Sequence, residues 1–195
     1  MLEKVILLLI TSFWFSQSAQ VATDKLPTPY EDVEAYRVYS AIIPSEWPLR
    51  VANAKQVVIH EATKGYEMCL RPEKEYEEII GPAISEYVRL NQQSWMLHRD
   101  FLIERPYELI SADELKATFE QGLQGWKKFY DQHPDSGGWI ELSAVGFNAD
   151  KTIAVVYMGH SCGGLCGGGA FHVLQKRDGK WIPLEWKGTR CAWAA

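Results

Sequence analysis

An eleven-residue stretch between two strand-like segments constrains this chain more than any other feature. It has the sequence Gly159-His160-Ser161-Cys162-Gly163-Gly164-Leu165-Cys166-Gly167-Gly168-Gly169, and it contains two of the four cysteines. So many glycines disfavour a helix, because glycine loses more backbone entropy on folding than any other residue. The stretch therefore predicts a loop between two strands, and it is the first place to look for a functional site.

The cysteines of the chain allow three disulfide pairings. They are Cys69, Cys162, Cys166 and Cys191. Glycine and leucine between Cys162 and Cys166 let the chain curl until the two Cα atoms come within the ~4.4–6.8 Å that a disulfide requires. We favour this bridge together with a Cys69–Cys191 bridge. In the chain-entropy model the short bridge stabilises the fold by roughly 2 kcal/mol and the long one by roughly 5 kcal/mol.

The N-terminal residues 1–19 have the layout of a secretory signal peptide. Lys4 precedes an apolar run from Val5 to Phe15, and small or polar residues follow up to Ala19. The run is shorter than the ~20 apolar residues that span a membrane. We expect cleavage after Ala19, a linker over 20–27 and no stable membrane insertion of the mature chain. Retention of the segment as an anchor is the alternative.

The remaining residues, 28–195, are predicted to form a single domain. With 195 residues in the whole chain and 47% of them hydrophobic, one core of ordinary size is expected. A secretory signal and an even number of cysteines place this domain in the periplasm or outside the cell, where disulfides persist. The sequence therefore predicts an extracytoplasmic, disulfide-stabilised domain.

Three helical regions are expected before residue 134. Thr28 to Glu31 has the pattern of a capping box, and it predicts a helix from Pro29 to about Ile43. A second region over 72–97 should break or kink at Gly81-Pro82. A second capping box at Ser111 to Glu114 predicts the third helix, which should run to His133.

Strand patterns dominate the C-terminal part of the chain. Alternation predicts an early strand over 55–63, and a short extended piece follows at 101–104. Four further strands are expected at 139–147, 153–158, 170–177 and 180–186, the last two joined by Asp178-Gly179. The fold class is therefore α+β, with N-terminal helices packed on one face of a C-terminal antiparallel β-meander.

The C-terminal third resembles an uncharacterised family of small secreted bacterial proteins. The motifs that carry the likeness are Val145-Gly146-Phe147-Asn148, Val156-Tyr157, Cys162-Gly163, Leu165-Cys166-Gly167 and Asp178-Gly179-Lys180-Trp181. The resemblance implies a secreted single domain and no particular activity. Cys69 and Cys191 do not belong to this pattern, so their role rests on this chain alone.

Aromatic residues are abundant, with eight Trp, nine Tyr and seven Phe. Such side chains form a large core, or they line a surface for a ligand such as a sugar or a peptide. Trp126, Tyr130 and Trp139 are the candidates for an aromatic surface, and burial in the core is the alternative. We hypothesise that a ligand lies between the helix that carries Trp126 and the glycine-rich stretch, because glycine permits close approach to the backbone.

The charge of the chain does not identify a partner. The formal net charge is −5, and no basic cluster suggests a nucleic-acid surface. We therefore expect no nucleic-acid partner, and the sequence names no other.

Two alternatives to a disulfide are open for the glycine-rich stretch. His160, Cys162, Cys166 and His172 offer two sulfur and two nitrogen ligands, a set that suits zinc or Cu(I). The same cysteines could exchange with substrate thiols if one of them had a lowered pKa. No other cofactor is expected.

A match to the serine-hydrolase motif G-x-S-x-G also falls in this stretch, at 159–163. The nucleophile of such an enzyme is followed by a helix and then by an acid and a histidine in that order. Here the following residues are glycine-rich, and His172 precedes Asp178. We interpret the match as a coincidence, assign no catalytic residue, and predict a binding or structural module.

Overall fold

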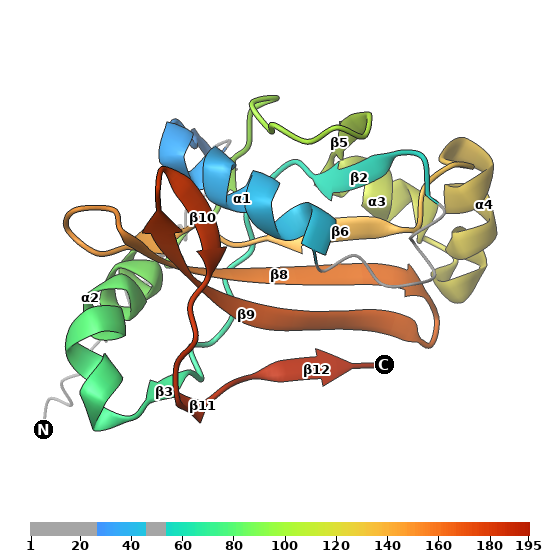
Figure 1. Ribbon diagram of the computed structural model, residues 1–195. Coiled ribbons are helices and arrows are strands. Elements are labelled where there is room, and N and C mark those ends of the chain that lie inside the picture. Colours follow the sequence, from blue (N-terminus) through green and yellow to red (C-terminus); the bar gives the residue numbers. More distant parts are fainter. Residues whose placement is uncertain (1–26, 46–53) are drawn as a thin grey trace, which may run out of the picture.

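The computed structural model describes residues 27–45 and 54–195, and it has the expected α+β composition (Figure 1). The helices are α1 (Val33–Ser45), α2 (Lys74–Leu90), α3 (Ala112–Thr118), the 3-10 turn η2 (Gly122–Gln124) and α4 (Gly125–Gln132). The strands are β1 (Thr28–Pro29), β2 (Val57–His60), β3 (Arg71–Pro72), β4 (Trp95–Met96), β5 (Tyr107–Ile110), β6 (Trp139–Leu142), β7 (Gly146–Phe147), β8 (Ile153–Gly163), β9 (Cys166–Arg177), β10 (Lys180–Pro183), β11 (Gly188–Thr189) and β12 (Ala192–Ala194). The predicted leader, 1–19, and linker residues 20–26 lie outside the described residues.

An eight-stranded sheet forms the centre of the molecule. Its order is β10-β9-β8-β6-β2-β5, with β12 beside β9 and β7 beside β8. The antiparallel meander is confirmed, since β6, β8, β9 and β10 are antiparallel neighbours. The sheet as a whole is mixed, because β2 pairs parallel to both β5 and β6. The extended piece expected at 101–104 is wrong, and the strand in this region is β5.

Helices cover both faces of this sheet, not one face as expected (Figure 1). One face packs against α1 and contributes Ile59, Leu142 and Val156 to the largest core cluster. The opposite face contacts α2 through a second cluster that includes Val155. A third cluster on this opposite face includes Val58 and packs against α4 through Phe129. Side chains alternate along each strand, so neighbouring strand residues belong to different clusters.

The start of α1 differs from the predicted capping box. Thr28 pairs with Trp95 in the short parallel β1–β4 ladder, so it does not cap a helix. The side chain of Asp32 caps α1 instead, because its Oδ1 accepts a hydrogen bond of 3.0 Å from the backbone N–H of Glu34. The capping box of α3 is confirmed, since the side chains of Ser111 and Glu114 bond to each other's backbone N–H.

The middle helices have different limits from those predicted. Helix α2 continues through Gly81-Pro82 and ends at Leu90, because Ile80, Ala83 and Tyr87 are buried on both sides of the proline and hold the helix together. The third predicted helix is divided into α3 and α4. Gly122, with φ +67°, takes a left-handed conformation that no helix can continue.

Two disulfides connect the described residues, with the pairing that we favoured. Cys69–Cys191 joins Cα atoms 6.1 Å apart, and Cys162–Cys166 joins Cα atoms 5.0 Å apart.

None of the helices in the described ranges is both long and apolar enough to cross a membrane.

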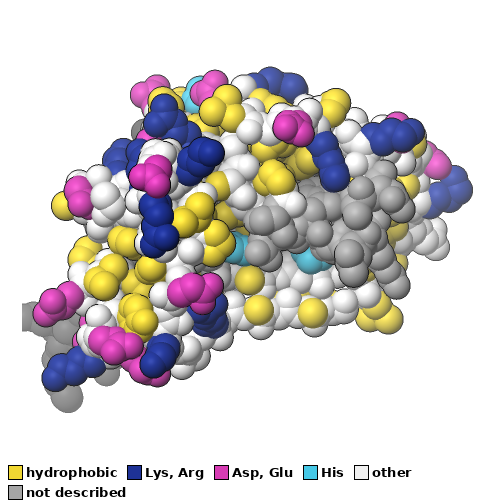
Figure 2. Space-filling view, viewed as in Figure 1, with side chains coloured by type: hydrophobic (Ala, Val, Ile, Leu, Met, Phe, Trp, Pro, Cys, Tyr) yellow, Lys and Arg dark blue, Asp and Glu magenta, His cyan; other side chains and the backbone are white. Residues whose placement is uncertain are grey.

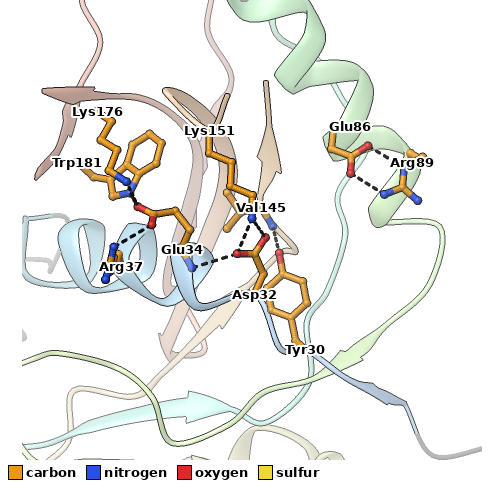
Figure 3. A network of polar contacts seen from close by, with 10 residues as sticks. All are labelled: Tyr30, Asp32, Glu34, Arg37, Glu86, Arg89, Val145, Lys151, Lys176 and Trp181. Carbon is orange, nitrogen blue, oxygen red and sulfur yellow. Dashed lines mark hydrogen bonds and ion pairs between the residues drawn. The ribbon is translucent and has the colours of Figure 1, made fainter. Parts of the chain in front are cut away.

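A polar network fastens α1 to the edge of the sheet (Figure 3). Glu34 accepts a 2.6 Å hydrogen bond from the indole of Trp181 and lies 2.8 Å from the ammonium of Lys176. Burial raises the pKa of Glu34, but the contacts with Lys176 and Trp181 outweigh burial and lower this pKa overall. Asp32 binds Lys151 at 2.9 Å in the same region. On this face of the molecule acidic and basic side chains are intermixed (Figure 2).

Candidate functional site

The glycine-rich stretch is part of a long β-hairpin and not the loop that was predicted. Strands β8 and β9 pair from Ile153 and Gln175 up to Gly163 and Cys166. Only Gly164 and Leu165 form the turn between them. The Cys162–Cys166 disulfide crosses the two strands next to this turn. The hairpin therefore carries the glycines on a flat, paired surface.

The register places four small residues together on the sheet face that packs against α2 and α4. In one row across the sheet, Glu141, Gly159, Gly169 and Trp193 lie opposite one another on β6, β8, β9 and β12. In the next row, Trp139, Ser161 and Gly167 lie opposite one another on β6, β8 and β9. Directly opposed residues share one face of an antiparallel sheet. We call Gly159, Ser161, Gly167 and Gly169 the glycine floor.

Two aromatic side chains explain why part of this floor must be glycine. A Cβ at Gly169 would overlap the hydroxyl of Tyr157 and lie 2.8 Å from the indole nitrogen of Trp193. A Cβ at Gly159 would lie 3.1 Å from the Tyr157 hydroxyl. The rings of Tyr157 and Trp193 therefore lie against the sheet backbone, and the indole N–H of Trp193 donates a 2.6 Å hydrogen bond to the Tyr157 hydroxyl.

The three residues predicted to form an aromatic surface do come together. Trp126 stacks on Trp139 with centroids 4.9 Å apart and on Tyr130 at 5.8 Å. The hydroxyl of Tyr130 donates a 2.9 Å hydrogen bond to the carbonyl of Cys162, which ties α4 to the hairpin. We call these three residues the aromatic shelf. They pack against the third core cluster and are half-buried, so the shelf combines core and surface roles.

Trp139 carries an unmet hydrogen bond. Its indole nitrogen is buried and has no acceptor among the residues that the structure describes. An unsatisfied buried donor costs about 1–3 kcal/mol, and a native structure seldom keeps one without a reason. Trp139 is opposite Ser161 of the glycine floor, so this unmet donor belongs to the same region of the sheet.

Charged and hydroxyl groups border the floor on the α2 side, and we call Lys64, Tyr66 and Glu141 the polar rim. Tyr66 stacks on Tyr157 with centroids 3.8 Å apart, and its hydroxyl donates a 2.9 Å hydrogen bond to Glu141. Lys64 lies 3.2 Å from the same carboxylate. Burial, followed by the charge of Glu141, raises the pKa of Tyr66. Burial also raises the pKa of Tyr157, so both hydroxyls remain proton donors at neutral pH.

The residues expected to form a metal site do not assemble in this structure. Cys162 and Cys166 are joined to each other, so neither offers a thiolate. His160 lies opposite Gly168 and His172 lies opposite Val156. The two imidazoles are thus four strand positions apart, or about 13 Å at ~3.3 Å per residue. No group of three or more His, Cys, Asp or Glu residues suited to a metal is present in 27–45 and 54–195.

Ser161, the nominal nucleophile of the G-x-S-x-G match, lies inside β8. The chain after it turns back into β9, whereas a nucleophile elbow leads into a helix. Burial lowers the pKa of the neighbouring His160. Ser161 therefore contributes a small side chain to the glycine floor. It does not lie in the strand-to-helix turn that positions a nucleophile.

Larger hollows exist on the α1 side of the molecule. One of about 470 Å³ is lined by Ile43, Val57 and Leu102 among others, and one of about 350 Å³ lies between Ile42 and Trp181 beside β9. The first is lined by the end of α1, Val57 and residues 102–105, and the second mostly by β9, β10 and residues 184–192. We take the glycine floor as the candidate site because it brings a carboxylate, an ammonium, three hydroxyls and exposed aromatic surface to one place.

Five residues of this site were missed by sequence reasoning: Lys64, Tyr66, Glu141, Tyr157 and Trp193. Strand alternation puts Tyr157 on the same face as Gly159, and this signal was available. Trp193 lies at the site because β12 pairs with β9. No local sequence pattern predicts this long-range pairing.

Comparison with protein-family models, with curated proteins and with solved structures found no match for this chain. The resemblance to small secreted bacterial proteins stays a prediction.

Proposed function

We propose that the protein is an extracytoplasmic binding module that holds an oligosaccharide on the glycine floor. The observation that carries the proposal is the register of the sheet. It places four residues without bulky side chains between Trp139 and Glu141 of β6 on one side and Trp193 of β12 on the other.

Trp193 supplies the stacking surface. Its side chain is fixed by the hydrogen bond to Tyr157, yet the residue keeps 45% of its surface exposed. A rigid indole with one end hydrogen-bonded and a ring face open to solvent binds an apolar sugar face at little entropic cost. The glycines let the rings of Tyr157 and Trp193 lie against the strands, so a sugar ring would stack on the solvent-facing side of Trp193.

The polar rim and Ser161 supply the groups that would recognise sugar hydroxyls. Glu141 is an acceptor whose two oxygens are already oriented by Tyr66 and Lys64. Carboxylate oxygens accept several hydrogen bonds, so Glu141 retains capacity for a ligand hydroxyl. The two rows of the floor carry one carboxylate, Glu141, whereas glycoside hydrolysis ordinarily uses a pair, so the proposal is binding and not glycoside hydrolysis.

The proposed compartment follows from two observations of different kinds. The sequence has the layout of a secretory leader at 1–19, and the fold contains two disulfides. Disulfides persist outside the cytoplasm, where polysaccharides of envelopes and matrices are also found.

Calorimetric titration tests the proposal, with cello-, chito- and malto-oligosaccharides of four or more sugars as probes. We expect saturable binding of at least one of them. Ser161→Leu adds a large side chain to the floor at a half-buried strand position and should weaken this binding at least about tenfold, which corresponds to ~1.4 kcal/mol. Leu102→Ala is the control, because Leu102 is exposed and lies away from the floor.

Absence of binding to every oligosaccharide, or equal affinity of wild type and Ser161→Leu, would overturn the proposal. Thermal unfolding of both variants shows whether each is folded, so a loss of binding through unfolding is distinguishable.

A further inference from the structure

The two disulfides lie in different surroundings. Cys69–Cys191 closes a separation of 122 residues, and Cys191 packs against the second core cluster. Cys162–Cys166 closes a separation of four residues beside the hairpin turn. Leu165, between these two cysteines, is 89% exposed. All four cysteines are half-buried, and what distinguishes the short bridge is its place beside an exposed hairpin turn, where an attacking thiolate can approach from solvent.

The fold holds the hairpin end in place without the short bridge. Backbone pairing reaches Ser161 and Gly167 and continues to Gly163 and Cys166. The Tyr130 hydroxyl also binds the carbonyl of Cys162, at 2.9 Å. These contacts involve no sulfur atom, so they persist when the bridge is reduced and keep the two thiols close enough to close again.

Apolar side chains from a distant part of the chain stand at the same end of the hairpin. Leu123 of η2 is 72% exposed. Its Cδ2 lies 3.3 Å from the position that a Cβ on Gly164 would occupy, so Leu123 and the hairpin turn are in contact. Two exposed leucines beside a reactive bond favour an extended polypeptide over a small hydrophilic thiol.

We propose that Cys162–Cys166 is an exchangeable disulfide that accepts two electrons from a polypeptide with two cysteine thiols. A thiolate of the polypeptide attacks one sulfur, the S–S bond breaks, and the other cysteine leaves as a thiolate that takes up a proton. The second polypeptide thiolate then attacks the mixed disulfide. The polypeptide gains a disulfide, and Cys162 and Cys166 end as two thiols. This activity is independent of oligosaccharide binding.

Differential alkylation of the native, full-length protein tests the proposal. The two probes are dithiothreitol and an unstructured peptide with two cysteines flanked by leucines, and peptide mapping reports each bridge separately. We expect Cys162–Cys166 to be reduced at least about tenfold faster than Cys69–Cys191, which serves as the internal control.

Two variants separate access from recognition. Leu165→Ser should slow reduction by the peptide several-fold and leave the rate with dithiothreitol unchanged. Leu102→Ser, an exposed leucine elsewhere on the surface, should change neither rate. Equal reduction rates of the two bridges in the native protein would overturn the proposal. So would a Leu165→Ser variant that reacts with the peptide and with dithiothreitol as the wild type does.

Discussion

The indole N–H of Trp193 donates a 2.6 Å hydrogen bond to the hydroxyl of Tyr157 across the glycine floor. The two residues come from β12 and β8, which are not neighbours in the sheet, and the glycines of β9 lie between them. Side chains at those positions would prevent the contact. The glycine-rich sequence is thus required by rings that lie against a strand.

Gly169→Ala tests this explanation. The added Cβ would overlap the Tyr157 hydroxyl, so we expect the free energy of unfolding to fall by about 1–3 kcal/mol in urea denaturation. The matched control is Gly81→Ala in α2, where a Cβ meets nothing within 4 Å apart from its neighbours in the same helix. That change should alter stability by less than about 1 kcal/mol, because the smaller loss of backbone entropy of alanine is offset by contact of its Cβ with the ring of Pro82. A neutral Gly169→Ala variant would contradict the explanation.

The pH dependence of stability tests the network around Glu34. Because the folded pKa of Glu34 lies below its unfolded value of about 4.3, its contribution is complete above that pH and is lost as pH falls through the folded pKa. Glu34→Gln should therefore lower stability at pH 7 by about 1–2 kcal/mol and reduce the loss of stability in acid. The measurement is urea denaturation between pH 7 and pH 3.

Glu86→Gln is the control for this prediction. Glu86 also has a lowered pKa, owing first to its hydrogen bond with Arg89, but this pair lies on the surface of α2 and water screens it. We expect a smaller loss of stability from Glu86→Gln than from Glu34→Gln. The reverse order would show that the α1 network does not stabilise the fold as described.

Removal of each disulfide should have a different effect on stability. Replacing Cys69 and Cys191 together with serine frees a loop of 122 residues, and the chain-entropy model gives a loss of roughly 5 kcal/mol. Replacing Cys162 and Cys166 frees only the hairpin turn, with a loss of roughly 2 kcal/mol. Thermal unfolding of the two double variants measures the difference, and equal losses would count against this assignment of roles.

Trp139→Phe tests the unmet hydrogen bond of the aromatic shelf. The change removes a buried donor whose isolation costs about 1–3 kcal/mol, and it also removes part of the packing against Trp126. The two effects oppose each other, so we expect stability to change by less than about 1 kcal/mol in urea denaturation. A loss above ~3 kcal/mol, typical of a well-satisfied core tryptophan, would show that the donor has a partner.

Local patterns in the sequence predicted the elements that depend on local contacts. The capping box at Ser111, the hairpin at Asp178-Gly179 and the early strand that became β2 were found in this way. A break or a kink was expected at Gly81-Pro82, and the break was wrong, because burial of Ile80 and Tyr87 on the sheet outweighs the weak propensity of these two residues.

The candidate site was predictable only in part, for the same physical reason. Trp126, Tyr130 and Trp139 were expected to form an aromatic surface; their rings stack on one another, and binding of a ligand there stays a prediction. The glycine-rich stretch was taken as a loop because glycine has low strand propensity. Its conformation depends on Tyr157 and Trp193. Trp193 contacts the stretch because β12, at the end of the chain, pairs with β9.

The most direct test of oligosaccharide binding is the indole N–H region of a ¹H–¹⁵N spectrum during titration with the tightest-binding oligosaccharide. Trp193→Phe and Trp139→Phe variants assign the indole signals of these two residues. The account predicts that the Trp193 and Trp139 signals shift with ligand, while that of Trp181, bonded to Glu34 at the far edge of the sheet, stays in place. Shifts confined to Trp181, or no shift of Trp193 at saturation, would contradict it.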